Sequence, residues 1–84
     1  MKLIKISAMW CPACLIMRNT LSNIDYNIDQ VEYDYDLDED IVNKYNVGEI
    51  LPVLILEDDN KEVARLIGEK SKEEILDFIR SNIK

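Results

Sequence analysis

The feature that most constrains this chain is a pair of cysteines, Cys11 and Cys14, which enclose Pro12 and Ala13. The residues before the pair are rich in isoleucine and partly alternate, which predicts a strand. The residues after it carry apolar side chains at helical spacing. A Cys-x-x-Cys motif at such a strand-to-helix junction is typical of a redox-active dithiol.

The motif also predicts a local geometry around the first sulfur. With Cys11 at the N-cap, Pro12 falls at the first helical position, where its missing N–H costs nothing. An N-cap side chain accepts a hydrogen bond from a backbone N–H of the first turn, and a thiolate accepts better than a thiol. Together with the positive end of the helix dipole, this favours the thiolate of Cys11, the attacking species in disulfide exchange.

The second sulfur is expected in different surroundings. Cys14 shares one stripe of the predicted helix with three apolar residues, namely Met17, Leu21 and Ile24. We therefore expect Cys14 to be the buried sulfur and Cys11 the exposed one. Cys11 would attack a substrate disulfide, and Cys14 would then attack Cys11 Sγ and release the reduced product. Trp10 would shield the site and offer an apolar surface to the substrate.

Strands and helices alternate along the rest of the chain. Strands are predicted at 3–8, 31–35, 53–57 and 62–67, helices at 12–24 and 39–45, and a last helix after Ser71. Ser71 and Glu74 form a capping box that opens the last helix, whose apolar side carries Ile75, Leu76, Ile79 and Ile83. The order β-α-β-α-β-β-α predicts one α/β domain over residues 1–84, a mixed four-stranded sheet with helices on both faces.

Composition excludes several function classes. A net charge of −7 argues against nucleic-acid and anionic membrane surfaces, and no apolar run is long enough to span a bilayer. The chain has no histidine, which rules out Cys–His and Ser–His–Asp catalysis, and its two cysteines cannot complete a zinc site. We therefore expect no metal and no bound cofactor. The first residues read as a strand interrupted by Lys5 and not as a signal peptide, so we expect a cytoplasmic protein.

The element order, the Cys-x-x-Cys and a second proline, Pro52, resemble the thioredoxin-like superfamily over essentially the whole chain. The resemblance implies that Pro52 follows a cis peptide bond and lies beside the sulfurs. It also implies that the backbone of Leu51 pairs with the substrate chain. Cys11 and Cys14 would be the catalytic residues and form the redox disulfide. The substrate-binding residues would be Trp10, Pro12, Leu51 and Pro52.

Two subfamilies compete for this resemblance. Trp10 matches the Trp-Cys-Gly-Pro-Cys of thioredoxins, whereas Pro12 stands where glutaredoxins have Cys-Pro-Tyr-Cys, and the short length is also glutaredoxin-like. The features of glutathione binding are missing, because Ala8 replaces a lysine and Gly68-Glu69-Lys70-Ser71 replaces a Gly-Gly with a following acidic residue. The buried aspartate that many thioredoxins carry six residues before the first cysteine is Lys5 here. Near the sulfurs, its charge would favour a thiolate; otherwise it is a strand residue that reaches solvent.

These observations predict a glutaredoxin-sized thiol–disulfide oxidoreductase with thioredoxin-like activity. Its partners would be disulfide-containing client proteins and a flavin- and NADPH-dependent thioredoxin reductase, and the protein would act as a monomer. Two alternatives remain open. The first is a glutaredoxin that uses glutathione, or a dedicated electron donor to one enzyme. The second is a binding module whose cysteines are idle or bridge a metal ion between two chains.

Overall fold

The computed structural model describes residues 1–24, 26 and 28–82 of the chain. Seven elements follow one another in the predicted order: β1 (Lys2–Ser7), α1 (Pro12–Ser22), β2 (Asp29–Asp34), α2 (Glu39–Lys44), β3 (Val53–Asp58), β4 (Lys61–Ile67) and α3 (Lys72–Asn82). The type and order of every element are confirmed. Ile83, assigned above to the apolar side of the last helix, lies outside the described residues.

Element ends differ from the prediction by one or two residues. α1 ends at Ser22 and not at position 24, because Asn23 caps it: its side-chain amide donates to the carbonyl of Asn19 at 3.0 Å. Asparagine side chains commonly compete with the helix for backbone groups in this way. β2 begins at Asp29, two residues before the expected start, because its pairing with β1 begins at Lys2 and Asp29. Hydrogen bonding to β1 therefore extends β2 into two polar residues whose sequence does not predict a strand.

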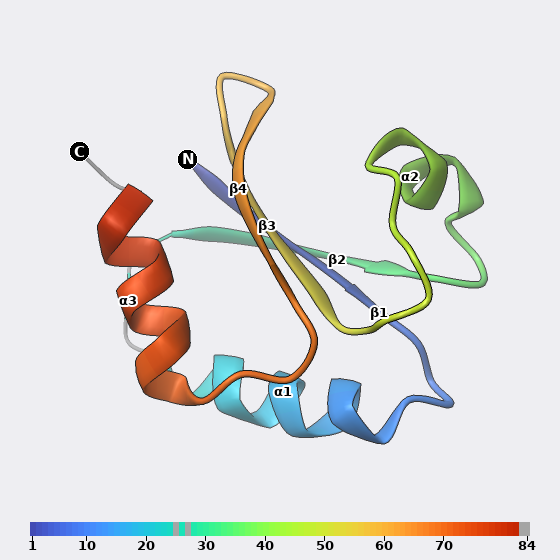
Figure 1. Cartoon of the computed structure of the whole chain (residues 1–84), viewed down its shortest axis with the longest axis horizontal. Coiled ribbons are helices and arrows are strands. Elements are labelled where there is room, and N and C mark those ends of the chain that lie inside the picture. Colours follow the sequence, from blue (N-terminus) through green and yellow to red (C-terminus); the bar gives the residue numbers. More distant parts are fainter. Residues whose placement is uncertain (25, 27, 83–84) are drawn as a thin grey trace.

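The four strands form one mixed sheet in the order β2-β1-β3-β4. β1 runs parallel to β2 and antiparallel to β3, and β3 runs antiparallel to β4 (Figure 1). The two central strands are the most apolar, as burial on both faces requires. The predicted mixed four-stranded sheet is confirmed.

Two buried clusters lie on opposite faces of the sheet. The cluster beneath α1 and α3 contains Leu3, Met17, Leu21, Leu54, Leu56, Ile75 and Ile79. The cluster on the other face, which α2 covers, includes Ile4, Ile6, Tyr45, Val53 and Ile55, with Ile41 and Val42 packed against it. Figure 1 shows α1 and α3 together on one side of the sheet and α2 on the other. Helices therefore cover both faces, as predicted.

The last helix begins with the expected cap. Ser71 Oγ accepts the backbone N–H of Glu74 at 3.2 Å and donates its own hydrogen to the Glu74 carboxylate at 3.3 Å. This arrangement satisfies one of the free amides at the helix start and places a carboxylate at its positive end. Within the part of the chain that the structure describes, no helix is long and apolar enough to cross a membrane.

Candidate active site

Cys11 occupies the N-cap of α1, as its spacing to Pro12 and Cys14 predicts. Its backbone is extended, with φ −99° and ψ 109°, and Pro12 is the first residue of the helix. Cys11 Sγ accepts a hydrogen bond from the backbone N–H of Cys14 at 3.3 Å. The sulfur therefore lies at the positive end of the helix dipole, next to a donor that a thiolate would use better than a thiol.

The prediction that Cys11 is exposed is wrong. Its exposed fraction is 7%, close to the 4% of Cys14, because the segment before β3 passes over it. The Cys11 thiol faces the backbone carbonyl of Leu51, with 3.9 Å between sulfur and oxygen. This contact joins residues 40 positions apart, so no local sequence pattern could have predicted it. The predicted burial of Cys14, Met17 and Leu21 is confirmed.

The two sulfurs differ in surroundings more than in exposure. Burial, and then a hydrogen bond with the Cys11 side chain, raise the pKa of the Cys14 thiol to about 11. The positive charge of Arg18, one helical turn further on, acts in the opposite direction. Cys14 is therefore a thiol near neutral pH. It suits the second step of an exchange, after another sulfur has reacted.

The proline segment lies where the resemblance places it. The Leu51–Pro52 peptide bond is cis, and Pro52 is buried immediately before β3. The Pro52 carbonyl accepts the backbone N–H of Gly68 at 2.9 Å, which ties this segment to the end of β4. Gly68 has a φ of 90°, a conformation that side-chain-bearing residues rarely adopt. Leu51 thus presents its backbone at the sulfur of Cys11.

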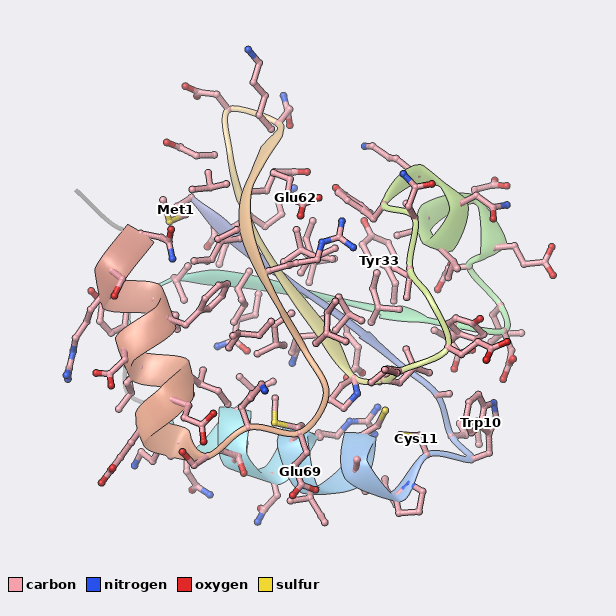
Figure 2. All side chains as sticks on the ribbon, viewed as in Figure 1. Met1, Trp10, Cys11, Tyr33, Glu62 and Glu69 are labelled. Atoms are coloured by element: carbon pink, nitrogen blue, oxygen red, sulfur yellow. The ribbon has the colours of Figure 1, made fainter. Side chains whose placement is uncertain are left out.

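Trp10 forms one wall of the site. Its indole Nε1 donates to Asp36 Oδ2 at 2.7 Å, and its ring meets the ring of Tyr35 edge-on, with 6.3 Å between the centroids. The side chain remains 60% exposed, so it is held in place while still facing solvent. Figure 2 shows Trp10 and Cys11 at the same end of the molecule, far from Met1. Its role in shielding the sulfur and contacting a substrate stays a prediction.

The sequence interpretation missed Tyr35 and Asp36 as site residues. Both follow β2, and parallel strands bring their carboxyl ends to the same edge, where the motif also begins. Asp34 shapes the turn, since its carboxylate accepts the backbone N–H groups of Asp36 and Leu37 at 2.8 and 3.0 Å. The signal that could have revealed them is an Asp-x-Asp sequence, residues 34–36, at the end of a strand parallel to the first.

Several exposed apolar side chains belong to the segments that carry the site residues. One is Trp10, and the others directly precede Trp10, Leu51 and Gly68 in the chain. The four residues are Met9, Trp10, Ile50 and Ile67. Their exposed fractions run from 47% to 86%. Apolar surface concentrated at one place is typical of a protein-binding site. We refer to these four residues as the apolar rim.

Lys5 and Pro12 complete the residues singled out above. Lys5 is partly buried on β1, between Glu32 of β2 and Leu54 of β3 in the ladder. Its neighbour Glu32 pairs with Arg18 of α1 at 2.9 Å. Pro12 is exposed at the start of the helix. Among the residues that the structure describes, no group of three or more histidine, cysteine, aspartate or glutamate side chains is arranged to hold a metal ion.

Comparisons with known proteins agree with this geometry. The Thioredoxin family model matches residues 1–81. A mutant thioredoxin from Halobacterium salinarum NRC-1 superposes with a TM-score of 0.90 at 21% identity, over 99% of this chain and 74% of that chain. Thioredoxin NaTrxh from Nicotiana alata superposes with a TM-score of 0.85 at 28% identity, over 99% of this chain and 73% of that chain. Thioredoxin 1 from Thermosipho africanus TCF52B superposes with a TM-score of 0.84 at 22% identity, over 96% of this chain and 92% of that chain. No curated protein sequence matches the chain.

Proposed function

The chain belongs to the thioredoxin family, and from this premise we propose that it reduces disulfide bonds in client proteins by dithiol exchange. The observation that carries the proposal is the capped sulfur of Cys11, with Cys14 buried behind it and the Leu51 backbone facing it. This arrangement supplies a nucleophile, a second thiol within reach and a backbone against which a client chain can lie.

The reaction balances with these two thiols alone. The Cys11 thiolate attacks one sulfur of the client disulfide, the client S–S bond breaks, and the other client sulfur leaves as a thiolate. Cys14 then loses its proton and attacks Cys11 Sγ, which forms the Cys11–Cys14 disulfide and releases the second client sulfur. Two electrons pass to the client, and the two cysteine protons end on the client thiols. Both cysteines are free thiols in the structure, as the first step requires.

The surroundings of Cys11 fit an extended client segment. The backbone of Leu51 next to the sulfur offers hydrogen bonds to a client chain, and Pro52 fixes the direction in which β3 leaves the site. The apolar rim would contact client side chains on either side of the disulfide. A disulfide in a flexible client segment can enter this site, whereas one buried in a rigid core cannot.

We propose a flavin- and NADPH-dependent thioredoxin reductase as the electron source. The residues that would hold glutathione are replaced here by Ala8 and by the Gly68-Glu69-Lys70-Ser71 stretch. The proposal needs no bound cofactor, and it places the protein as a monomer in the cytoplasm, where clients have to be reduced. Both cysteines belong to the reactive pair, so none remains for a structural disulfide.

A two-tube assay tests the function and its electron source. Insulin serves as the disulfide substrate, with NADPH and a thioredoxin reductase in one tube, and glutathione, NADPH and glutathione reductase in the other. We expect turnover in the first tube and none with Cys11→Ser in either. Turnover only with glutathione would assign the protein to the glutaredoxin mode. Equal signals from the wild type and Cys11→Ser would show that the cysteines are idle.

A further inference from the structure

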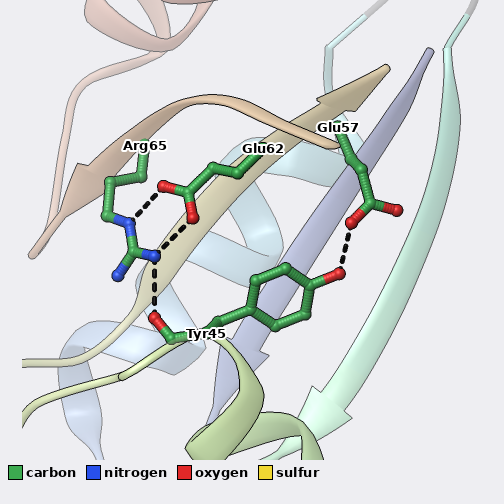
Figure 3. Close-up of polar contacts among 4 residues, drawn as sticks. All are labelled: Tyr45, Glu57, Glu62 and Arg65. Carbon is green, nitrogen blue, oxygen red and sulfur yellow. Dashed lines mark hydrogen bonds and ion pairs between the residues drawn. The ribbon is translucent and has the colours of Figure 1, made fainter. Parts of the chain in front are cut away.

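A polar network on the α2 face of the sheet has no part in the chemistry described so far. Arg65 of β4 donates from Nε and Nη2 to both carboxylate oxygens of Glu62, each at 2.6 Å. The same Nη2 donates to the backbone carbonyl of Tyr45 at 2.7 Å. The Tyr45 hydroxyl donates to the buried carboxylate of Glu57 on β3 (Figure 3). Two strands therefore hold both the backbone and the side chain of one residue.

Tyr45 is the point where the chain leaves α2 for the active site. It is the C-cap of α2, and Asn46 follows with a φ of 52°, so the backbone turns sharply there. An arginine that binds a terminal helix carbonyl satisfies a group the helix leaves free. The Tyr45 ring belongs to the same buried cluster as Cys11 and Leu51. The network therefore reaches the site both through the backbone and through side-chain packing.

The segment from 46 to 52 is secured at its ends. At its start, the Val47 amide donates to the Val42 carbonyl at 3.0 Å, and at its end, Pro52 accepts from Gly68. Between 48 and 51, the structure shows no backbone-to-backbone hydrogen bond to another described residue. This middle part carries Ile50 of the apolar rim and the Leu51 carbonyl at Cys11. Its position therefore depends on where the two ends are held and on the packing of Leu51 in the buried cluster.

We propose that Arg65 is a positioning residue of the active site, which places the 46–52 segment for client binding by holding the Tyr45 carbonyl. The role of the segment in client binding rests on the function proposed above, and the hold on the segment itself does not. Glu62 keeps the guanidinium aimed at that carbonyl. Arg65 touches neither sulfur, and the hydrogen bond from the Cys14 amide to Cys11 Sγ lies within the start of α1, so Arg65 should affect client docking far more than the reactivity of Cys11.

The test separates docking from reactivity. In the insulin assay, Arg65→Met should raise KM about fivefold and change kcat less than twofold. A fivefold change corresponds to the net free energy of about one hydrogen bond. The rate of Cys11 alkylation by iodoacetamide, which needs no docking, should stay within about twofold of the wild type. Arg65→Lys keeps a charged donor and should recover part of the KM. Arg80→Met removes an equal charge from an exposed site on α3 and should leave KM unchanged.

Two outcomes would overturn the proposal. One is an unchanged KM in folded Arg65→Met. The other is a change in the alkylation rate as large as the change in KM, in either direction, which would mean that Arg65 acts on Cys11 itself and not on client docking. If Arg65→Met does not fold, Glu62→Gln is used in its place. That variant keeps Arg65 and removes the carboxylate that orients the guanidinium. Its KM should rise by less than that expected for Arg65→Met, and a KM equal to the wild type would contradict the role of Glu62 in aiming Arg65.

A second measurement does not depend on turnover. Backbone amide signals of residues 48–51 in two-dimensional NMR spectra should shift in Arg65→Met and stay in place in Arg80→Met. Shifts confined to residues next to Tyr45 would show that the segment is not positioned by Arg65. If the wild type fails to reduce insulin, the proposed function fails, while these spectra still decide whether Arg65 holds the segment.

Discussion

A rise in pH should accelerate the second step of the exchange, because Cys14 must lose its proton before it can attack. Burial is the largest cause of its raised pKa, and burial persists when Cys11 is already joined to a substrate. The hydrogen bond with the Cys11 thiol, the second cause, is lost in that state. The resolving step should therefore still depend steeply on pH.

The pKa of about 11, which includes the Cys11 hydrogen bond, sets the upper limit of the effect. At pH 7, four units below it, about one Cys14 in ten thousand is ionised, against about one in a hundred for the ordinary value of 9.0. The scarcer thiolate is also the stronger nucleophile, which recovers about tenfold of that hundredfold difference. Resolution should therefore be slower at pH 7 than with an ordinary thiol, by at most about tenfold, and should rise about tenfold for each pH unit up to pH 9.

Single-turnover kinetics with an aromatic disulfide measure this directly, because each step releases one coloured thiolate. The first phase reports attack by Cys11 and the second reports resolution by Cys14. Cys14→Ser should retain the first phase and lose the second, which assigns the phases. A second phase that levels off below pH 8 would refute the reasoning, since it would mean that burial does not keep Cys14 protonated.

Three further predictions address trapping, docking and stability. Cys14→Ser should accumulate mixed disulfides between Cys11 and client proteins, seen as reductant-sensitive bands on non-reducing gels, and an absence of such bands would count against the two-step mechanism. Asp36→Asn weakens the acceptor of the Trp10 indole and should raise the KM for insulin a fewfold, with a change in the fluorescence of this single tryptophan; an unchanged spectrum would show that the contact does not hold the ring. Ile79→Ala removes a fully buried side chain and should lower the free energy of unfolding by about 2–5 kcal/mol in urea titrations, whereas a loss below about 1 kcal/mol would mean that α3 packs loosely.

The features predicted correctly from sequence are those that neighbouring residues determine. The place of Cys11 at the N-cap depends on Pro12 and Cys14 alone, and the cap of the last helix depends on Ser71 and Glu74. Helix and strand periods likewise reveal which face of an element is apolar. These signals were enough for the element order and for the mixed sheet.

The features that sequence reasoning missed join distant parts of the chain. The cover over Cys11 comes from Leu51, 40 residues away, and the acceptor of Trp10 lies 26 residues away. Arg65 and Tyr45 are 20 residues apart. Such contacts depend on strand order and loop path, which no local pattern encodes. The exposure of Cys11 was mispredicted for this reason, since its helix-start geometry was right and its cover was unknown.

The reactivity of Cys11 likewise depends on neighbouring residues, whereas the choice of client depends on contacts between distant parts of the chain. The nucleophile is built by four adjacent residues and would work wherever they begin a helix. The surface that we propose for client binding comes from three segments, at 9–10, 46–52 and 67–68, and each is held by a hydrogen bond to a residue elsewhere in the chain. Asp36 holds the first, Arg65 the start of the second, and the Gly68 amide joins the second to the third. Substitutions at Asp36 and Arg65 should therefore change which disulfides are reduced, while small reagents still react with Cys11 at the wild-type rate.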